Sequence, residues 1–172
     1  MAVLEILKYP HPGLKKKCEN VCRIDEETLK LVRDMTDTMY RANGIGLAAS
    51  QVGVHKRVIV LDVSPMDPEK EFMALINPEV LSGEGEVEYE EGCLSVPECV
   101  EKLTRQEKIR VRGLTPEGKE VEVPGEGILA IALQHELDHL NGTLILDRVS
   151  RLKRELYRRK VQKERKREKE EE

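Results

Sequence analysis

Aromatic residues are scarce in this sequence: its 172 residues include no Trp, one Phe and four Tyr. Long apolar stretches are also missing, and no run approaches the roughly 18 residues of a membrane-spanning helix. The first residues, Met1 to Lys8, lack the basic leader and apolar core of a secretory signal. We therefore expect a cytoplasmic protein that uses no membrane anchor.

Cysteine is limited to four residues, Cys18, Cys22, Cys93 and Cys99. In a reducing cytoplasm, cysteines are more often free thiols or metal ligands than disulfides. Reduced structural thiols are the simplest interpretation of Cys18, Cys22 and Cys99. Cys93 lies just after an alternating stretch of sequence, and its thiolate is a candidate metal ligand.

Charge is abundant but nearly balanced, with 36% charged residues and a net charge of -4. This balance gives the whole chain no electrostatic signature of nucleic-acid or membrane binding. The distribution is uneven, however. From Arg148 onward there are 12 Lys and Arg against 6 Asp and Glu, a net +6, which leaves -10 for residues 1–147. The sequence thus divides into an acidic body and a basic tail.

The length suits one domain, which we place at residues 1–150, followed by a charged helix or tail at 151–172. Capping and helical spacing predict a helix over 25–40. A buried helix is predicted over 128–140, and an amphipathic helix from 151 that ends in about ten disordered residues. Alternating or β-branched stretches predict strands at 57–63, 74–76, 86–89, 108–114 and 119–123. The expected fold is α+β, with mostly antiparallel sheets wrapped around the central helix.

That central helix carries the pattern His135-Glu136-Leu137-Asp138-His139. On a helix, H-E-x-x-H places both imidazoles one turn apart on one face, where they can bind a single metal ion. Glu136 then lies beside the metal without ligating it, as a general base requires. Chance matches to so short a pattern do occur, so the motif alone does not establish a site.

A catalytic centre of this kind usually takes three protein ligands. The extended metzincin pattern requires a histidine six residues after the second one, but Ile145 occupies that position. A thermolysin-like site requires a downstream glutamate, and Glu155 and Glu164 lie in the charged tail, where a solvated face explains them better. Cys93 remains as the third candidate, with a small buried hydrophobe as its alternative interpretation.

Three segments together resemble the signature motifs of the peptide deformylase family: residues 44–51 (GIGLAASQ), 91–95 (EGCLS) and 134–139 (QHELDH). Their order and separation match the family, and the resemblance covers about residues 1–150. It implies that Cys93, His135 and His139 bind the metal, with water as the fourth ligand. The native metal would be ferrous iron (Fe2+), and zinc, nickel or cobalt can occupy such a site.

By the same resemblance, Glu136 is the general base, while Gln51 and the backbone N-H of Leu94 hold the formyl oxygen as it becomes an oxyanion. The activity implied is removal of the N-formyl group from the formyl-methionine of nascent polypeptides, with release of formate. The remaining residues implied are those that bind substrate. Ile45, Gly46 and Gly92 would contact the peptide backbone, and Ile131 and Ala132, with Ile45, would border the methionine pocket.

The sequence departs from the family pattern at Cys99-Val100, near which many bacterial members carry an arginine that contacts substrate. Two alternatives stay open: a metalloprotease that cuts internal peptide bonds, which needs neither Cys93 nor Gln51, and a binding protein that has lost activity, which has no use for Glu136. We expect a monomer. The basic C-terminal helix is interpreted either as a solvated helix or as a docking element for the ribosome.

Overall fold

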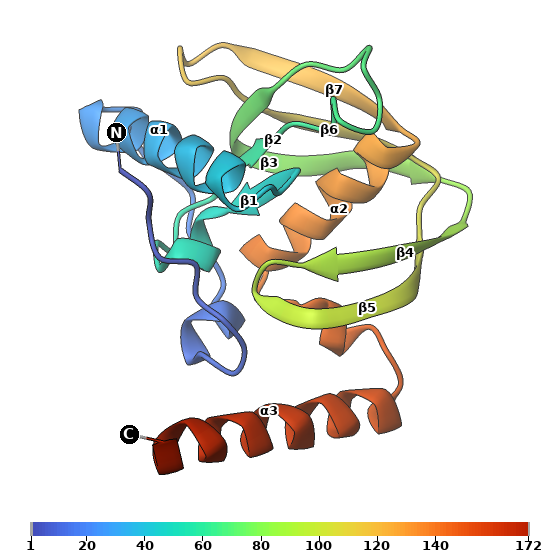
Figure 1. Ribbon diagram of the computed structural model, residues 1–172. Coiled ribbons are helices and arrows are strands. Elements are labelled where there is room, and N and C mark those ends of the chain that lie inside the picture. Colours follow the sequence, from blue (N-terminus) through green and yellow to red (C-terminus); the bar gives the residue numbers. More distant parts are fainter. Residues whose placement is uncertain (1, 172) are drawn as a thin grey trace.

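The predicted central helix is present as α2 (Ile128–Leu140) in the computed structural model, which describes residues 2–171. It starts after Gly127, whose φ is +62°, and it ends where the backbone N-H of Asn141 donates to the carbonyls of Leu137 and Asp138. Its apolar run packs on several sides at once, and nine of its residues are buried. In Figure 1, α2 lies between two sheets, as expected for a helix that is apolar nearly all round.

The larger sheet is antiparallel, with strand order β1-β2-β3-β6-β7. The strands are β1 (Gly46–Ala48), β2 (Val58–Leu61), β3 (Met73–Glu84), β6 (Lys108–Leu114) and β7 (Glu120–Glu126). β3 extends well beyond the predicted residues 74–76. Pro78 lies within this strand; the register shifts between Ile76 and Glu79, and this bulge accommodates the proline.

The smaller sheet is a hairpin of β4 (Val87–Cys93) and β5 (Val96–Arg105), on the other side of α2 (Figure 1). β5 was not predicted, and it carries Pro97 near its start. In a two-stranded sheet both strands are edges, so a residue without a backbone N-H is tolerated. The hairpin also runs four residues past the predicted end of β4, to Cys93.

Helix α1 (Glu26–Arg41) matches the prediction within one residue, and the Asp25 side chain caps it by accepting from the Thr28 backbone N-H. Its buried Met35 and Met39 pack with β1 and β2, and a second apolar cluster lies between the large sheet and α2. Short 3-10 turns, η1 (Pro12–Lys15), η2 (Ala49–Val52) and η3 (Ile145–Asp147), connect these elements. Buried Ile145 belongs to a third cluster, under the hairpin.

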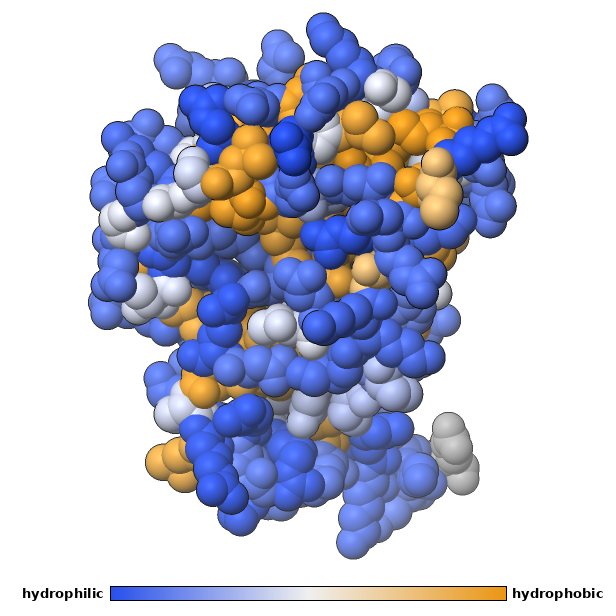
Figure 2. Space-filling model, turned by 180° about the vertical axis from the view of Figure 1, so that it is seen from behind, coloured by the Kyte–Doolittle hydropathy of each residue, from blue (hydrophilic) through white to orange (hydrophobic). Residues whose placement is uncertain are grey.

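The basic C-terminal segment forms helix α3 (Arg151–Glu171), so the expected disorder of the last ten residues is wrong for the described part of the chain. Repeated Lys, Arg and Glu are strong helix formers even where nothing packs on them. No residue of α3 is buried, and Figure 2 shows it as a mainly hydrophilic element below the body. The Tyr157 hydroxyl donates to the Pro97 carbonyl at 2.8 Å, which ties α3 to β5.

These elements confirm the predicted α+β class with antiparallel sheets around a central helix. No helix in residues 2–171 has the length and apolar character needed to cross a bilayer.

Candidate metal centre and catalytic pocket

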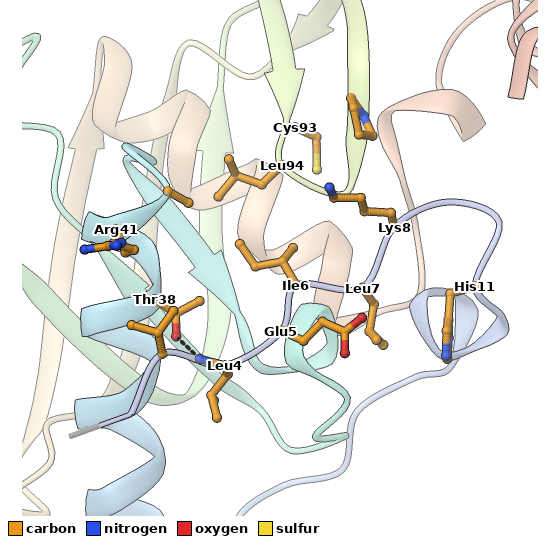
Figure 3. Close-up of a pocket in the computed structure, with 13 residues that line it drawn as sticks. Leu4, Glu5, Ile6, Leu7, Lys8, His11, Thr38, Arg41, Cys93 and Leu94 are labelled. Carbon is orange, nitrogen blue, oxygen red and sulfur yellow. Dashed lines mark hydrogen bonds between the residues drawn. The ribbon is translucent and has the colours of Figure 1, made fainter. Parts of the chain in front are cut away.

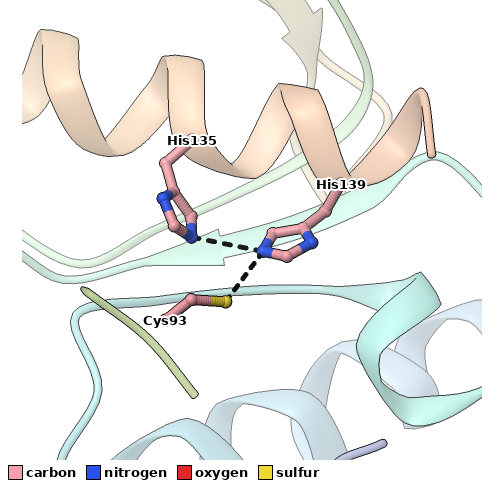
Figure 4. A group of neighbouring side chains, drawn as sticks. All are labelled: Cys93, His135 and His139. Carbon is pink, nitrogen blue, oxygen red and sulfur yellow. Dashed lines mark hydrogen bonds between the residues drawn. The ribbon is translucent and has the colours of Figure 1, made fainter. Parts of the chain in front are cut away.

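Three side chains suited to metal binding converge where α2 faces the end of β4. His135 and His139 lie one turn apart on α2, with their Nε2 atoms 3.2 Å apart. The Cys93 Sγ, at the last residue of β4, lies 3.3 Å from the His139 Nε2. All three donor atoms fall within 4.8 Å of one another, and Figure 4 shows them pointing toward a common point.

This donor set fits a tetrahedral metal ion. For metal–nitrogen distances of about 2.0–2.1 Å and metal–sulfur distances of about 2.3 Å, a tetrahedron separates two nitrogens by about 3.3 Å and a nitrogen from a sulfur by about 3.6 Å. Two of the three separations, 3.2 Å between the two Nε2 atoms and 3.3 Å between the Cys93 Sγ and the His139 Nε2, are close to these values, and the third is within 4.8 Å. No other trio of His, Cys, Asp or Glu within residues 2–171 is arranged in this way.

A carboxylate orients the first of the two imidazoles. The His135 Nδ1 lies 3.0 Å from the Glu91 Oε1, so the Nδ1-H can donate to Glu91 while Nε2 faces Cys93 and His139. Arg105 holds Glu91 in turn, through Nε to Oε2 and Nη2 to Oε1, both at 2.8 Å. Such outer partners fix the tautomer and ring orientation of metal-binding histidines.

Burial and hydrogen bonding shift the pKa values of His135, Glu136 and His139 in different directions. Burial lowers the pKa of His139, and the neighbouring His135 lowers it further. Burial also lowers the pKa of His135, but hydrogen bonds with Cys93 and Glu91 outweigh this and raise it well above its ordinary value. For Glu136, burial raises the pKa to about 7. A carboxyl group with a pKa near neutrality can both accept and donate a proton at physiological pH.

Glu136 is 4% exposed and lies on the side of α2 that faces β1. Its Oε2 is buried and has no hydrogen-bond partner among the residues described. Its Oε1 lies against Gly46, where a Cβ would come within 2.8 Å of that oxygen. The carboxylate therefore occupies space that only a glycine at position 46 leaves open.

Gln51, in η2, has its amide orientation set at both ends. Its Oε1 accepts from the Ala48 backbone N-H at 2.9 Å, so its Nε2 points to the Ser95 Oγ at 3.0 Å and to the Cys93 Sγ at 3.8 Å. This places an N-H donor beside the candidate metal donors. Leu94, the residue after Cys93, lines the same cavity.

A cavity of about 390 Å³ joins these groups, and it is lined by ten of the eleven predicted site residues. His139, 1% exposed, lies behind it. The ten residues are Ile45, Gly46, Gln51, Gly92, Cys93, Leu94, Ile131, Ala132, His135 and Glu136. The structure also adds Met66 and Tyr89 to the lining, which the sequence analysis did not identify.

A larger cavity of about 730 Å³ adjoins the first and shares Cys93 and Leu94 with it. The N-terminal segment from Val3 to Lys8 forms much of its wall, and the Leu4 backbone N-H donates to the Thr38 Oγ1 at 2.8 Å (Figure 3). None of His135, Glu136 and His139 lines this larger cavity. The smaller cavity, which His135 and Glu136 line, is therefore the candidate site.

An H-E-x-x-H helix, a cysteine thiol aimed at its imidazoles and a buried carboxylate in one cavity define a metal-dependent hydrolase. Comparison with known proteins specifies the class further. The family profile described as polypeptide deformylase matches residues 3–155, and the chain belongs to this family. It is a metal-dependent enzyme that removes the N-formyl group from nascent polypeptides.

Relatives resemble the chain over nearly its full length. The peptide deformylase of Thermodesulfovibrio yellowstonii is 54% identical over 160 residues, covering 93% of this chain and 97% of that protein. The crystal structure of the Legionella pneumophila enzyme matches with a TM-score of 0.89 and 46% identity, over 96% of both chains. The Ehrlichia chaffeensis enzyme in complex with actinonin matches with a TM-score of 0.89 and 40% identity, over 95% of this chain and 98% of that one.

Proposed function

We propose that Cys93, His135 and His139 hold the catalytic metal and that the native ion is ferrous iron, which zinc, nickel or cobalt can replace. One thiolate and two neutral imidazoles suit any of these borderline or softer cations, so the donor types support a metal without selecting one. The bound ion would supply a Lewis acid that makes water nucleophilic near neutral pH.

Glu136 is proposed as the general base and acid of the reaction. It takes a proton from the attacking water and delivers it to the departing amine, so one carboxylate serves both transfers. The Gln51 Nε2 and the Leu94 backbone N-H are proposed to donate to the formyl oxygen as negative charge develops there. The pKa of about 7 for Glu136 and the fixed amide of Gln51 support these roles.

Substrate binding is proposed to use two strand edges. β1 is the outer strand of the larger sheet, and β4 pairs only with β5 among the described strands, so each has an edge free for an extended peptide. Ile45 and Gly46 beside β1, and Gly92 on β4, would contact the peptide backbone. Ile131 and Ala132 of α2 would contact the methionine side chain, with Ile45 across the cavity.

The observation that carries this proposal is the convergence of three donor atoms, Glu136 and the Gln51 amide in one cavity. The test is an anaerobic assay of formate release from a formyl-methionyl peptide, with metal analysis of the same preparation. We expect protein purified from cells grown without added zinc or nickel to contain one equivalent of iron. The rate of formate release should be proportional to the metal content of the preparation. Formate release that is independent of metal content would contradict the proposed site.

The surroundings in which the enzyme works are also proposed here. We place the catalytic domain at residues 1–150, expect a cytoplasmic monomer, and assign the C-terminal segment 151–172 to docking on the ribosome, where formylated termini emerge. The net charge of +6 from Arg148 onward and the lack of buried residues in α3 support docking to an anionic surface.

A further inference from the structure

A chain of ion pairs leads from the metal-binding group to the protein surface. It begins at His135, whose Nδ1 lies 3.0 Å from the Glu91 Oε1, and it continues through the two hydrogen bonds that Arg105 donates to Glu91. The side chains of Arg105 and Glu91 are 2% and 4% exposed. These buried charges are paired on both sides, as charges in a protein interior must be.

Beyond Arg105 the chain continues through Asp138, which lies one turn after His135 on α2. The Arg105 Nη1 donates to the Asp138 Oδ2 at 2.6 Å. Arg148, just after η3, donates to the same carboxylate from the solvent side, from Nε to Oδ2 at 2.6 Å and from Nη2 to Oδ1 at 2.7 Å. Four elements, α2, β4, β5 and the segment after η3, are joined by these contacts.

The planar geometry of these groups transmits orientation along the chain. A two-pronged arginine–carboxylate pair fixes the plane of both partners. Arg148 fixes the plane of Asp138, and Asp138 then limits where the Nη1 of Arg105 can lie. Arg105 fixes the plane of Glu91, whose Oε1 sets the direction of the His135 Nδ1-H.

We propose that Arg148 is a positioning residue that holds the His135 imidazole in its metal-binding orientation through Asp138, Arg105 and Glu91. The proposal rests on the ligand role assigned to His135 above. Nothing in the sequence marks Arg148 for this role, because it belongs to the basic tail by composition and reaches α2 only through the turn at η3.

A purely structural role for Arg148 predicts different measurements. Its side chain is 42% exposed, and an exposed ion pair contributes little to stability. If Arg148 had only a structural role, its replacement would lower the thermal midpoint slightly and change neither metal release nor the His135 resonance. A positioning role changes how firmly the metal is held and how strongly the His135 Nδ1-H is hydrogen bonded.

The experiment uses the full chain loaded with zinc and compares Arg148→Gln, Arg148→Lys and a matched control, Arg110→Gln. Arg110 is 49% exposed and pairs with Glu122 at 3.1 Å, away from the site. The measurements are the rate of zinc release to a chelator and the His135 Nδ1-H proton resonance in 15N-histidine-labelled protein.

We expect Arg148→Gln to release zinc about threefold to tenfold faster than the original chain. Loss of a direct partner of a metal-bound histidine typically costs 10–100-fold in metal affinity. The expected effect of Arg148→Gln is smaller because Arg148 acts on Glu91 only through three successive ion pairs. The His135 resonance should move upfield, Arg148→Lys should fall between the two, and Arg110→Gln should match the original chain.

Unchanged zinc release and an unchanged resonance in Arg148→Gln would overturn the positioning role, even if the thermal midpoint fell. An equal change in Arg110→Gln would overturn it as well, because the effect would then be one of general surface charge. Failure of the original chain to hold one equivalent of zinc would overturn the ligand set itself, and this inference with it.

Discussion

Replacing Gly46 by Ala should disturb catalysis by moving the Glu136 carboxylate. A Cβ at position 46 would lie 2.8 Å from the Glu136 Oε1 and 3.0 Å from the Leu61 Cδ2, whereas ordinary contacts begin at 3.4 Å. The carboxylate must therefore shift by about 0.6 Å. Since a misplacement of about 1 Å can cost about 100-fold, we expect turnover to fall about tenfold, or roughly 1.4 kcal/mol in the barrier.

The assay is formate release from a formyl-methionyl peptide at saturating substrate, with metal content and thermal midpoint measured on the same samples. The control is the same substitution in a Glu136→Ala background, where the added methyl group has no carboxylate to displace. There, Gly46→Ala should leave the residual rate unchanged, because the two effects act through one group. A tenfold loss in that background too, or no loss in the original chain, would refute the steric reasoning.

Other perturbations have equally direct outcomes. Glu136→Gln should keep the metal, as metal analysis will check, but lower turnover at least about 100-fold through loss of proton transfer. Cys93→Ser should weaken metal binding sharply in equilibrium titrations, and iron-dependent activity of the original chain should decay in air and be preserved with nickel. The hydrogen bond from Lys30 lowers the pKa of Asp34 from its ordinary 3.8, so its contribution to the unfolding free energy is complete above about pH 5 and declines as the pH falls through the lowered pKa. Asp34→Asn should flatten urea-denaturation stability over that acidic range. Deletion of the residues after Arg151 should reduce ribosome co-sedimentation at low salt and spare deformylation of a short peptide; equal co-sedimentation would make the tail a solvated helix.

The parts of the fold that the sequence predicted are those with a strong local period. The helices over 26–41 and 128–140 have capping residues and either an apolar stripe or an apolar run, so their positions were predicted within one residue. β3 was predicted too short and β5 was missed; each contains a proline, Pro78 in β3 and Pro97 in β5. A bulge and an edge strand accommodate them, and both depend on which strands pair, which local pattern does not specify.

More of the residues around the cavity than of the strand boundaries could be named from the sequence. The resemblance to the peptide deformylase motifs identified residues that the fold gathers around one cavity, and their roles are proposals. The charged residues that lie behind Glu91 in the ion-pair chain, Arg105 and Asp138, were missed, since in the sequence they look like ordinary surface residues. One signal was present: Leu103 and Arg105 occupy the inward positions of an alternating strand, so a charged residue there needs a buried partner.

The candidate metal donors come from two different elements, two imidazoles from the central helix and one thiol from the β4–β5 hairpin. Residues 93 and 135 are 42 positions apart in the chain. A cross-link that closes a loop of about 40 residues removes on the order of 4 kcal/mol of entropy from the unfolded chain. An ion bound by these donors would therefore stabilise the fold as a cross-link between helix and hairpin, in addition to its role in the reaction. Its loss would weaken the attachment of the hairpin to the helix, which the Glu91–His135 and Arg105–Asp138 contacts also provide, and amide hydrogens of β4 and β5 would then exchange with solvent sooner than those of the five-stranded sheet.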